Sequence, residues 1–286
     1  MATAKFTSAC IFAILLAGCN PVKFGTNNPA AANGPGTTGT EPGTPPPKSC
    51  TATNVEAITR LTKIYFLVDT SGSNIESTYN PGTCGASSCL TPATDPTKAF
   101  RGGAISDFLN RFSHKGNFHW GFAVFSQDSA HALINNGNDQ SPIFATPANV
   151  LQFALNTFST IQDYGNTPYH SALSMAATAI SNDPDLHSAA HPNYFVILLT
   201  DGFPTDYYIQ GQFNSQLMTN DIQSLLATAP GQVNLSSIYY GLANDPTAIN
   251  LLKSMASMGG GQFAAATSTN QFKIDDVIPG SQENCP

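Results

Sequence analysis

Residues 63–68 read Lys-Ile-Tyr-Phe-Leu-Val, and the chain continues with Asp69-Thr70-Ser71-Gly72-Ser73. A nearly continuous apolar run of this length is typical of a parallel β-strand that is covered on both faces. A second such run, Tyr-Phe-Val-Ile-Leu-Leu at 194–199, leads directly into Thr200-Asp201-Gly202. Ligands of open parallel sheets bind outside the carboxyl ends of the strands. Because both aspartates follow a predicted strand, we expect them at the ligand-binding edge of one sheet.

The other periodic segments alternate between strands and helices. Asp245-Pro246 is a typical helix start, with an N-cap residue followed by proline at the first helical position. Helices are predicted at about 100–112, 150–158, 168–180, 212–228 and 246–258, with a weak helix near the end, and further strands at 118–125, 130–134, 233–240 and 262–266. The strands at 118–125 and 130–134 are expected to form a hairpin. The pattern predicts an α/β fold with a doubly wound, mostly parallel central sheet, helices on both faces and one antiparallel edge strand.

Three short segments supply the residues of a candidate metal site. The two quoted above are joined by Gly165-Asn166-Thr167-Pro168, at the start of a predicted helix. The reactive atoms are hydroxyl and carboxylate oxygens, which suit a hard divalent cation, Mg²⁺ before Mn²⁺ or Ca²⁺, and do not suit zinc or copper. Each segment alone also fits an ordinary role, as an Asx turn, a helix N-cap or a strand-ending turn. Their combination favours the metal site.

The order and flanks of these segments, over about residues 60–275, resemble the von Willebrand factor type A (VWA) family, which has a Rossmann-like fold. The resemblance implies the metal-ion-dependent adhesion site (MIDAS) of that family. It implies that Ser71, Ser73 and Thr167 supply hydroxyl oxygens. It also implies that Asp69 and Asp201 bind the ion directly or through water. In this family the metal ion binds an acidic side chain of a partner protein.

This ligand set predicts a binding function. Neutral hydroxyl groups leave a cation strongly electrophilic, so it gains most from a carboxylate supplied by another molecule. We therefore expect a protein ligand that supplies Asp or Glu, in adhesion or protein–protein interaction at the cell envelope. Two alternatives stay open: a metal-dependent hydrolase, in which the cation activates water, and an envelope scaffold whose ion only stabilises the fold. The sequence contains no Gly-x-Ser-x-Gly elbow, P-loop or His-Glu-x-x-His motif, so we expect no enzyme activity.

The N-terminus carries an export signal. Lys5 precedes a short apolar run at 9–16, which is too short to span a bilayer and is typical of a secretory signal. Leu16-Ala17-Gly18-Cys19 resembles the lipobox of bacterial lipoproteins, which implies cleavage before Cys19 and lipidation of that cysteine. An ordinary secretion signal is the alternative. Asn20 stands where an Asp would retain a lipoprotein at the inner membrane, so in a Gram-negative host we expect the outer membrane, facing the periplasm or the surface.

Composition indicates the division of the chain. Residues 1–18 are predicted to be the signal peptide, 19–49 a lipidated, Pro/Gly/Thr-rich tether, and 50–286 the VWA domain, with an insertion at about 74–96. A tether of this composition cannot bury enough apolar surface to fold. The formal net charge of −7 argues against nucleic acid as a partner, because phosphate binding needs clustered Lys and Arg.

The cysteines fit an exported protein. Besides Cys19, and Cys10 of the signal, four remain, which allows three pairings. We favour Cys50–Cys285, which brackets the domain, and Cys84–Cys89, which closes a small loop in the insertion. A thiol metal site is the alternative, but no Cys-x-x-Cys pair supports it. A second long loop, at 202–211, is expected to rim the metal-binding edge, with Tyr207 and Tyr208 exposed as a contact surface.

Overall fold

The computed structural model describes residues 58–75, 78–79, 90–91, 93–241, 245–266 and 272–278. The predicted signal peptide, the tether with Cys19, and the four cysteines of the predicted disulfides lie outside these residues. Among the helices that are described, none is both long enough and apolar enough to cross a bilayer.

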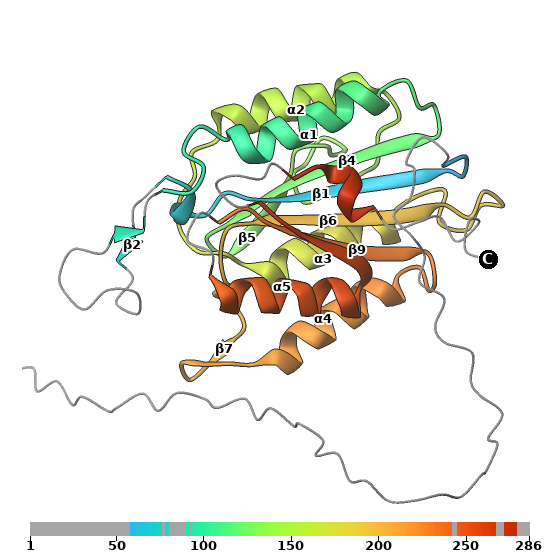
Figure 1. Cartoon of the computed structure of the whole chain (residues 1–286). Helices are drawn as coiled ribbons and strands as arrows, with labels where there is room; N and C mark the ends of the chain where they lie inside the picture. Colours follow the sequence, from blue (N-terminus) through green and yellow to red (C-terminus); the bar gives the residue numbers. More distant parts are fainter. Residues whose placement is uncertain are drawn as a thin grey trace, which may run out of the picture. The chain divides into compact units, whose positions relative to one another are not determined.

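A six-stranded sheet in the order β10-β9-β6-β1-β4-β5 forms the centre of the described domain (Figure 1). β1 (Thr62–Asp69), β4 (Phe118–Ser126), β6 (Asn193–Thr200), β9 (Val233–Tyr239) and β10 (Gly260–Ala265) are parallel. β5 (Ser129–Ala132) pairs antiparallel with β4 at one edge. The predicted fold class is confirmed, including the hairpin that provides the antiparallel edge strand.

The connections place a topological switch point between β1 and β6. From β1 the chain moves to β4 and β5 on one side, then returns to β6 on the other side of β1 and continues to β9 and β10. Crevices of this kind, at the carboxyl ends of the strands, are where open α/β sheets bind ligands. Asp69 ends β1 and Asp201 follows β6, so the two aspartates border this crevice from adjacent strands.

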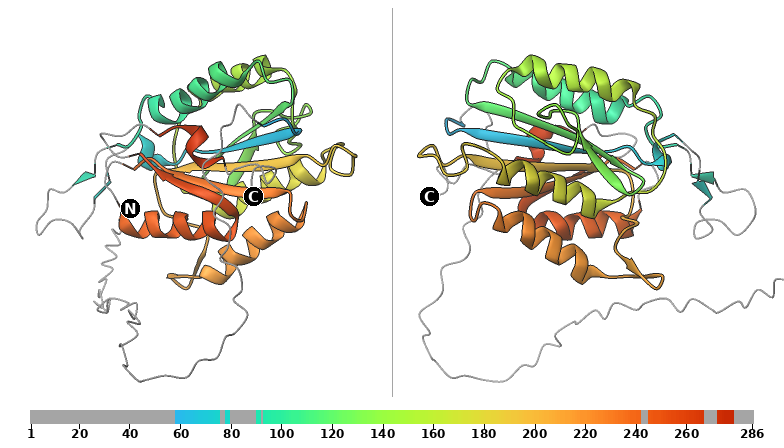
Figure 2. Two further views of the ribbon diagram at one scale, coloured as in Figure 1. Left: turned by 45° about the vertical axis from the view of Figure 1, so that its right-hand side comes forward. Right: turned by 180° about the vertical axis from the view of Figure 1, so that it is seen from behind.

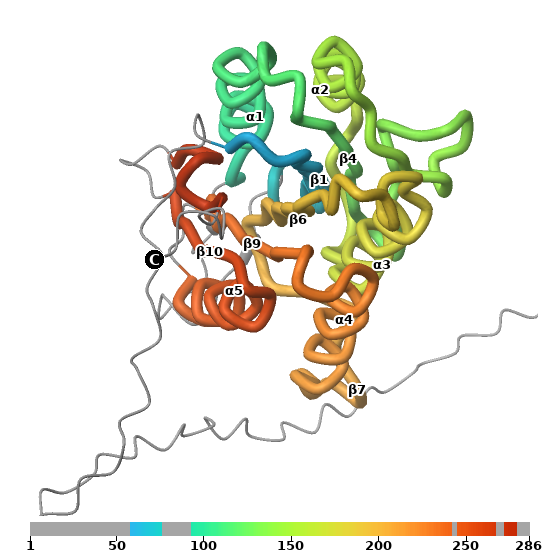
Figure 3. Tube along the Cα trace, turned by 90° about the vertical axis from the view of Figure 1, so that its right-hand side faces the viewer, coloured from blue at the N-terminus to red at the C-terminus, as the bar shows by residue number. Residues whose placement is uncertain are grey.

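Helices cover both faces of the sheet, as Figure 3 shows along the strands and Figure 2 from two sides. α1 (Ala99–Phe112), α2 (Ala148–Thr160) and the short 3₁₀ helix η3 (Ile274–Val277) pack on one face. α3 (Tyr169–Ser181), α4 (Ser215–Ala227) and α5 (Pro246–Met258) pack on the other. Ile64, Phe66 and Val68 enter the first core, whereas Tyr65 and Leu67 enter the second. Burial on both faces explains why the β1 sequence shows no polar alternation.

The start of α5 confirms the capping prediction. The Asp245 carboxylate accepts hydrogen bonds from the backbone N–H groups of Thr247 and Ala248, at 2.8 and 3.3 Å, and proline follows at the first helical position. These bonds satisfy two of the donors that a helix N-terminus leaves without partners.

The predicted start of α4 at about residue 212 is wrong. Residues 208–213 form a hairpin of β7 (Tyr208–Ile209) and β8 (Gln212–Phe213), and the helix begins at Ser215. Gln210 and Gly211 both have positive φ angles, 50° and 78°, as a tight two-residue hairpin turn requires. The Asn214 side chain then caps the helix. The expectation that both tyrosines of this loop are exposed is also corrected, because Tyr207 is buried and only Tyr208 is exposed.

Two small elements lie beyond the carboxyl ends of the sheet strands. A 3₁₀ turn, η2 (Gly72–Asn74), follows β1 directly. Within the predicted insertion, β2 (Thr78–Tyr79) and β3 (Leu90–Thr91) pair antiparallel. Figures 1 and 2 show β2 and the β7–β8 hairpin projecting at the same end of the domain.

Candidate metal centre

Four of the five predicted ligands form one chain of hydrogen bonds at the switch point. The backbone N–H of Ser71 donates to Asp69 Oδ1 at 2.7 Å, and the Ser71 and Ser73 hydroxyl oxygens share a hydrogen bond at 3.1 Å. The Ser73 hydroxyl then donates to Asp201 Oδ1 at 2.8 Å, which joins the end of β1 to the end of β6. The structure thus brings these four residues together at the ends of β1 and β6, and metal binding by them stays a prediction.

The segment that carries Thr167 is hydrogen-bonded to both of the other segments, the one after β1 and the one after β6. Gly72 N–H donates to the Gly165 carbonyl at 3.0 Å. The N–H of Thr167 donates to Thr205 Oγ1, and the N–H of Thr205 donates to the Thr167 carbonyl, both at 3.0 Å. Thr167 is 6% exposed, and its hydroxyl makes no hydrogen bond to another described residue. Its backbone is therefore held in place while the hydroxyl keeps its bonding capacity.

Gly165 explains how this segment comes so close to the edge of the sheet. Its φ of +76° lies in the left-handed region, and a Cβ atom there would meet Gln127 Cγ at 2.6 Å. Only glycine satisfies both conditions without rearrangement.

The two carboxylates carry an electrostatic cost in the absence of a cation. Asp69 is fully buried, and desolvation, followed by repulsion from Asp201, raises its pKa from 3.8 to about 7. Desolvation also raises the pKa of Asp201, although hydrogen bonds from Ser73 and Thr94 oppose the shift. Asp201 Oδ2 is buried and has no hydrogen-bond partner. A positive charge beside these groups would offset the cost of burial.

The residues fit a hard divalent cation. Every side-chain ligand atom that the cluster and Thr167 offer is an oxygen, with three hydroxyl groups and two carboxylates among these five residues. Within the described ranges, no group of three or more His, Cys, Asp or Glu side chains is placed to hold a metal ion. That result agrees with the composition of this cluster, because only two of its members are acidic. The unpartnered Asp201 oxygen gives the cluster a free anionic ligand.

Two hydroxyl residues near the cluster were missed as participants by sequence reasoning. The Thr200 hydroxyl donates to Asp69 Oδ2 at 2.6 Å, so both carboxylate oxygens of Asp69 are engaged. The Tyr169 hydroxyl lies 3.3 Å from Thr200 Oγ1 and donates to the Gly202 carbonyl at 2.7 Å. Thr200 was visible in the motif, but nothing in the sequence indicates that it bonds Asp69.

A fully buried arginine connects the end of β1, the end of the insertion and the segment before Gly165. Arg101 of α1 donates to the Asp69 carbonyl, to the carboxylate and carbonyl of Asp95, and to the Asp163 carboxylate. Asp95 lies at the end of the insertion, and Asp163 lies two residues before Gly165. Burial of an arginine at 0% exposure is tolerable because its donors meet two carboxylates. The helical pattern of α1 gives no signal for this role.

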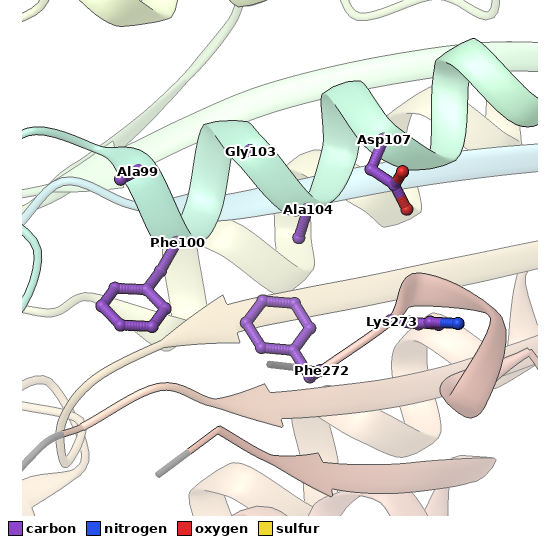
Figure 4. Close-up of a pocket in the computed structure, with 7 residues that line it drawn as sticks. All are labelled: Ala99, Phe100, Gly103, Ala104, Asp107, Phe272 and Lys273. Atoms are coloured by element: carbon purple, nitrogen blue, oxygen red, sulfur yellow. The ribbon is translucent and has the colours of Figure 1, made fainter. Parts of the chain in front are cut away.

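A groove of ≈ 380 Å³ lies elsewhere, between α1 and the segment that leads to η3 (Figure 4). Ala99, Gly103 and Ala104 provide a shallow helix surface there, and the rings of Phe100 and Phe272 border it. The groove shares no lining residue with the strand-end cluster, so it plays no part in the candidate metal centre.

Comparisons with known proteins find similar solved structures. No protein family and no curated protein matches the chain. Among solved structures, it is similar to the D319A mutant of the PilB minor pilin from Streptococcus sanguinis (15% identity, TM-score 0.48), over 75% of this chain and 59% of that one. It is similar to the vWF domain of the type V pili tip protein Mfa5 from Porphyromonas gingivalis, with 13% identity and a TM-score of 0.48. This match covers 74% of this chain and 91% of that one. It is also similar to the SpRpn10 VWA domain, with 11% sequence identity and a TM-score of 0.47, over 74% of this chain and 91% of that one.

The chain has a six-stranded, mostly parallel α/β fold, and VWA domains are among the solved structures that it is similar to. It spans less than two thirds of the length of the PilB minor pilin. These likenesses assign no function to the chain, so function has to be inferred from the residues at the strand ends.

Proposed function

We propose that this protein is a VWA module that binds an acidic side chain of a protein partner through a divalent metal, in adhesion or protein–protein interaction at the cell envelope. The observation that carries the proposal is the hydrogen-bonded cluster of Asp69, Ser71, Ser73 and Asp201. Asp201 Oδ2 in this cluster is buried and accepts no hydrogen bond, so it is available to bind a cation. A buried polar atom of this kind costs free energy unless something binds it.

The contacts suggest a role for each residue. Ser71, Ser73 and Thr167 would offer hydroxyl oxygens to the ion, and Asp201 would offer Oδ2. Asp69 would act through water or by orienting the serines, since both of its oxygens already accept hydrogen bonds. Mg²⁺ fits this oxygen set, and Mn²⁺ or Ca²⁺ would also fit. When bound, the ion would supply an electrophilic position for a carboxylate from the partner.

The proposal extends to the anchoring of the domain. A lipidated Cys19 and the tether at 19–49 would hold residues 50–286 at the membrane, most simply at the bacterial outer membrane, with disulfides Cys50–Cys285 and Cys84–Cys89. Mass spectrometry of the native protein tests both features, by an acylated N-terminal peptide that begins at Cys19 and by cysteine-linked peptides. Cys19→Ser should release the protein from the membrane fraction; retention there would refute the anchor.

Metal binding is tested first by isothermal titration of Mg²⁺ into the purified chain. Asp201→Ala should abolish the binding heat, and Ser73→Ala should weaken the affinity by about tenfold or more. Ser224→Ala is the matched control, because this exposed hydroxyl lies on α4, where it bonds only the Asn220 carbonyl. Equal Mg²⁺ affinity in Asp201→Ala and wild type would refute the site.

Partner binding is tested by selecting displayed random peptides on the immobilised chain, in Mg²⁺ and in EDTA. Enrichment of Asp or Glu in Mg²⁺ alone supports the proposal. Tight Mg²⁺ binding without acidic enrichment would favour a structural ion, as in the scaffold alternative.

A further inference from the structure

Several exposed apolar side chains lie on segments that lead away from the metal-binding edge. Seven large apolar residues are exposed in the described ranges, and three of them, Tyr164, Tyr208 and Ile209, lie on such segments. Tyr164 is held there because its N–H donates to the Thr70 carbonyl at 2.9 Å. A concentration of exposed apolar groups at one end of a domain typically marks an interaction site.

The β7–β8 hairpin provides the most prominent of these groups. Tyr208 is 46% exposed and Ile209 is 50% exposed, on a hairpin that projects beyond the strand ends (Figure 1). Residues 207–213 contain no charged side chain. An isolated two-stranded hairpin is marginally stable in water, so this hairpin depends on packing with neighbouring residues of the domain.

Aromatic packing makes the hairpin a preformed arm. Phe203 and Phe213 have ring centroids 4.8 Å apart, and Tyr208 lies 5.9 Å from Phe213 and 6.2 Å from Phe203. The tight turn at Gln210-Gly211 fixes the tip. A surface ordered before binding loses less conformational entropy when a partner docks.

The arm is joined directly to the metal centre. Phe203 follows Asp201 by two residues, and Thr205, between Phe203 and the hairpin, exchanges two hydrogen bonds with Thr167. The hairpin is therefore connected, through Thr205, to the segment that carries the predicted ligand Thr167.

We propose that the β7–β8 hairpin is a second contact arm, and that the partner segment carries an aromatic or aliphatic side chain near the Asp or Glu that the metal centre takes. This inference rests on the proposed function and adds the apolar half of the ligand. Exposed Tyr208 and Ile209 would cover the apolar side chain while the carboxylate enters the metal centre. The absence of charge on residues 207–213 favours a neutral, apolar neighbour over a basic one.

The test repeats the peptide selection in Mg²⁺ with three forms of the full chain: wild type, the double variant Tyr208→Ser/Ile209→Ser, and the control Phe153→Ser. Phe153 is 69% exposed on α2, on the opposite face of the sheet from α4. Circular dichroism and Mg²⁺ titration should show that all three fold and bind the ion alike.

Wild type and Phe153→Ser should select peptides with an acidic residue and an aromatic or aliphatic one, whereas the double variant should select the acidic residue alone. The Kd of a selected wild-type peptide should rise about tenfold or more in the double variant. Identical apolar enrichment in all three forms, or none in wild type, would overturn the inference. Apolar enrichment that depends on the hairpin but occurs without Mg²⁺-dependent acidic enrichment would overturn the proposed function instead and leave the hairpin as a metal-independent contact surface.

Discussion

Replacing Asp69 with Asn should remove a pH dependence of stability that burial of this carboxylate creates. In the folded protein without metal, desolvation and then Asp201 raise the pKa of Asp69 from 3.8 to about 7. The folded state therefore holds this proton more tightly than the unfolded state does. Tighter proton binding in the folded state adds to the free energy of unfolding. This contribution is fully present below pH 3.8, the pKa of the unfolded state, and is lost as the pH rises through about 7, the pKa of the folded state. At about 1.4 kcal/mol for each pH unit between the two pKa values, the whole loss is on the order of 4 kcal/mol.

The assay is urea denaturation in EDTA at about pH 5 and about pH 8, which covers the upper part of this range. Wild type should lose about 2–3 kcal/mol more than Asp69→Asn between these pH values. His119, whose pKa is lowered chiefly by desolvation, contributes in the opposite direction, but it is present in both proteins and cancels in the comparison.

The stabilisation of the wild type by Mg²⁺ should also depend on pH. A bound cation takes over the role of the proton, so Mg²⁺ should stabilise wild type strongly at about pH 8, by about 2.7 kcal/mol at a concentration 100 times its Kd, and much less at about pH 5. The reasoning fails if wild type and Asp69→Asn show the same pH dependence in EDTA, or if Mg²⁺ stabilises wild type equally at both pH values.

Three further substitutions test other contacts by urea or thermal denaturation. Arg101→Met should lower the free energy of unfolding by about 3–5 kcal/mol, because it leaves the buried carboxylates of Asp95 and Asp163 without their partner. Arg111→Met is the control, since Arg111 is partly exposed, and should cost no more than about 1 kcal/mol. Similar losses in the two variants would contradict the importance of the buried Arg101 ion pairs. Gly165→Ala should destabilise more than Gly137→Ala, since both have positive φ but only the former meets a neighbouring residue, and equal losses would count against that contact. Asp245→Ala should cost about 1 kcal/mol through loss of the α5 cap, and an unchanged melting temperature would exclude the capping role.

The mistakes of sequence reasoning have a common physical origin. The residues at 208–213 were assigned partly to a helix because local pattern did not reveal a two-residue turn stabilised by packing between Phe203 and Phe213. Tyr207 was expected to be exposed because it lies in a connecting loop, but it packs against the core that contains α3 and α4. Both outcomes depend on contacts between segments that are not periodic in sequence.

The sequence by itself determined the layers of the fold and the chemistry of the candidate site. Continuous apolar runs such as 63–68 and 194–199 can be buried only as strands covered on both faces, and the residues that follow them must then meet at one edge. Only the tertiary structure decided how the groups at that edge are paired. It left Asp201 Oδ2 without a partner, engaged both oxygens of Asp69, and buried Arg101 against two aspartates. Hydrogen bonding and desolvation depend on distances between atoms far apart in the chain, and no local pattern of residues encodes those distances.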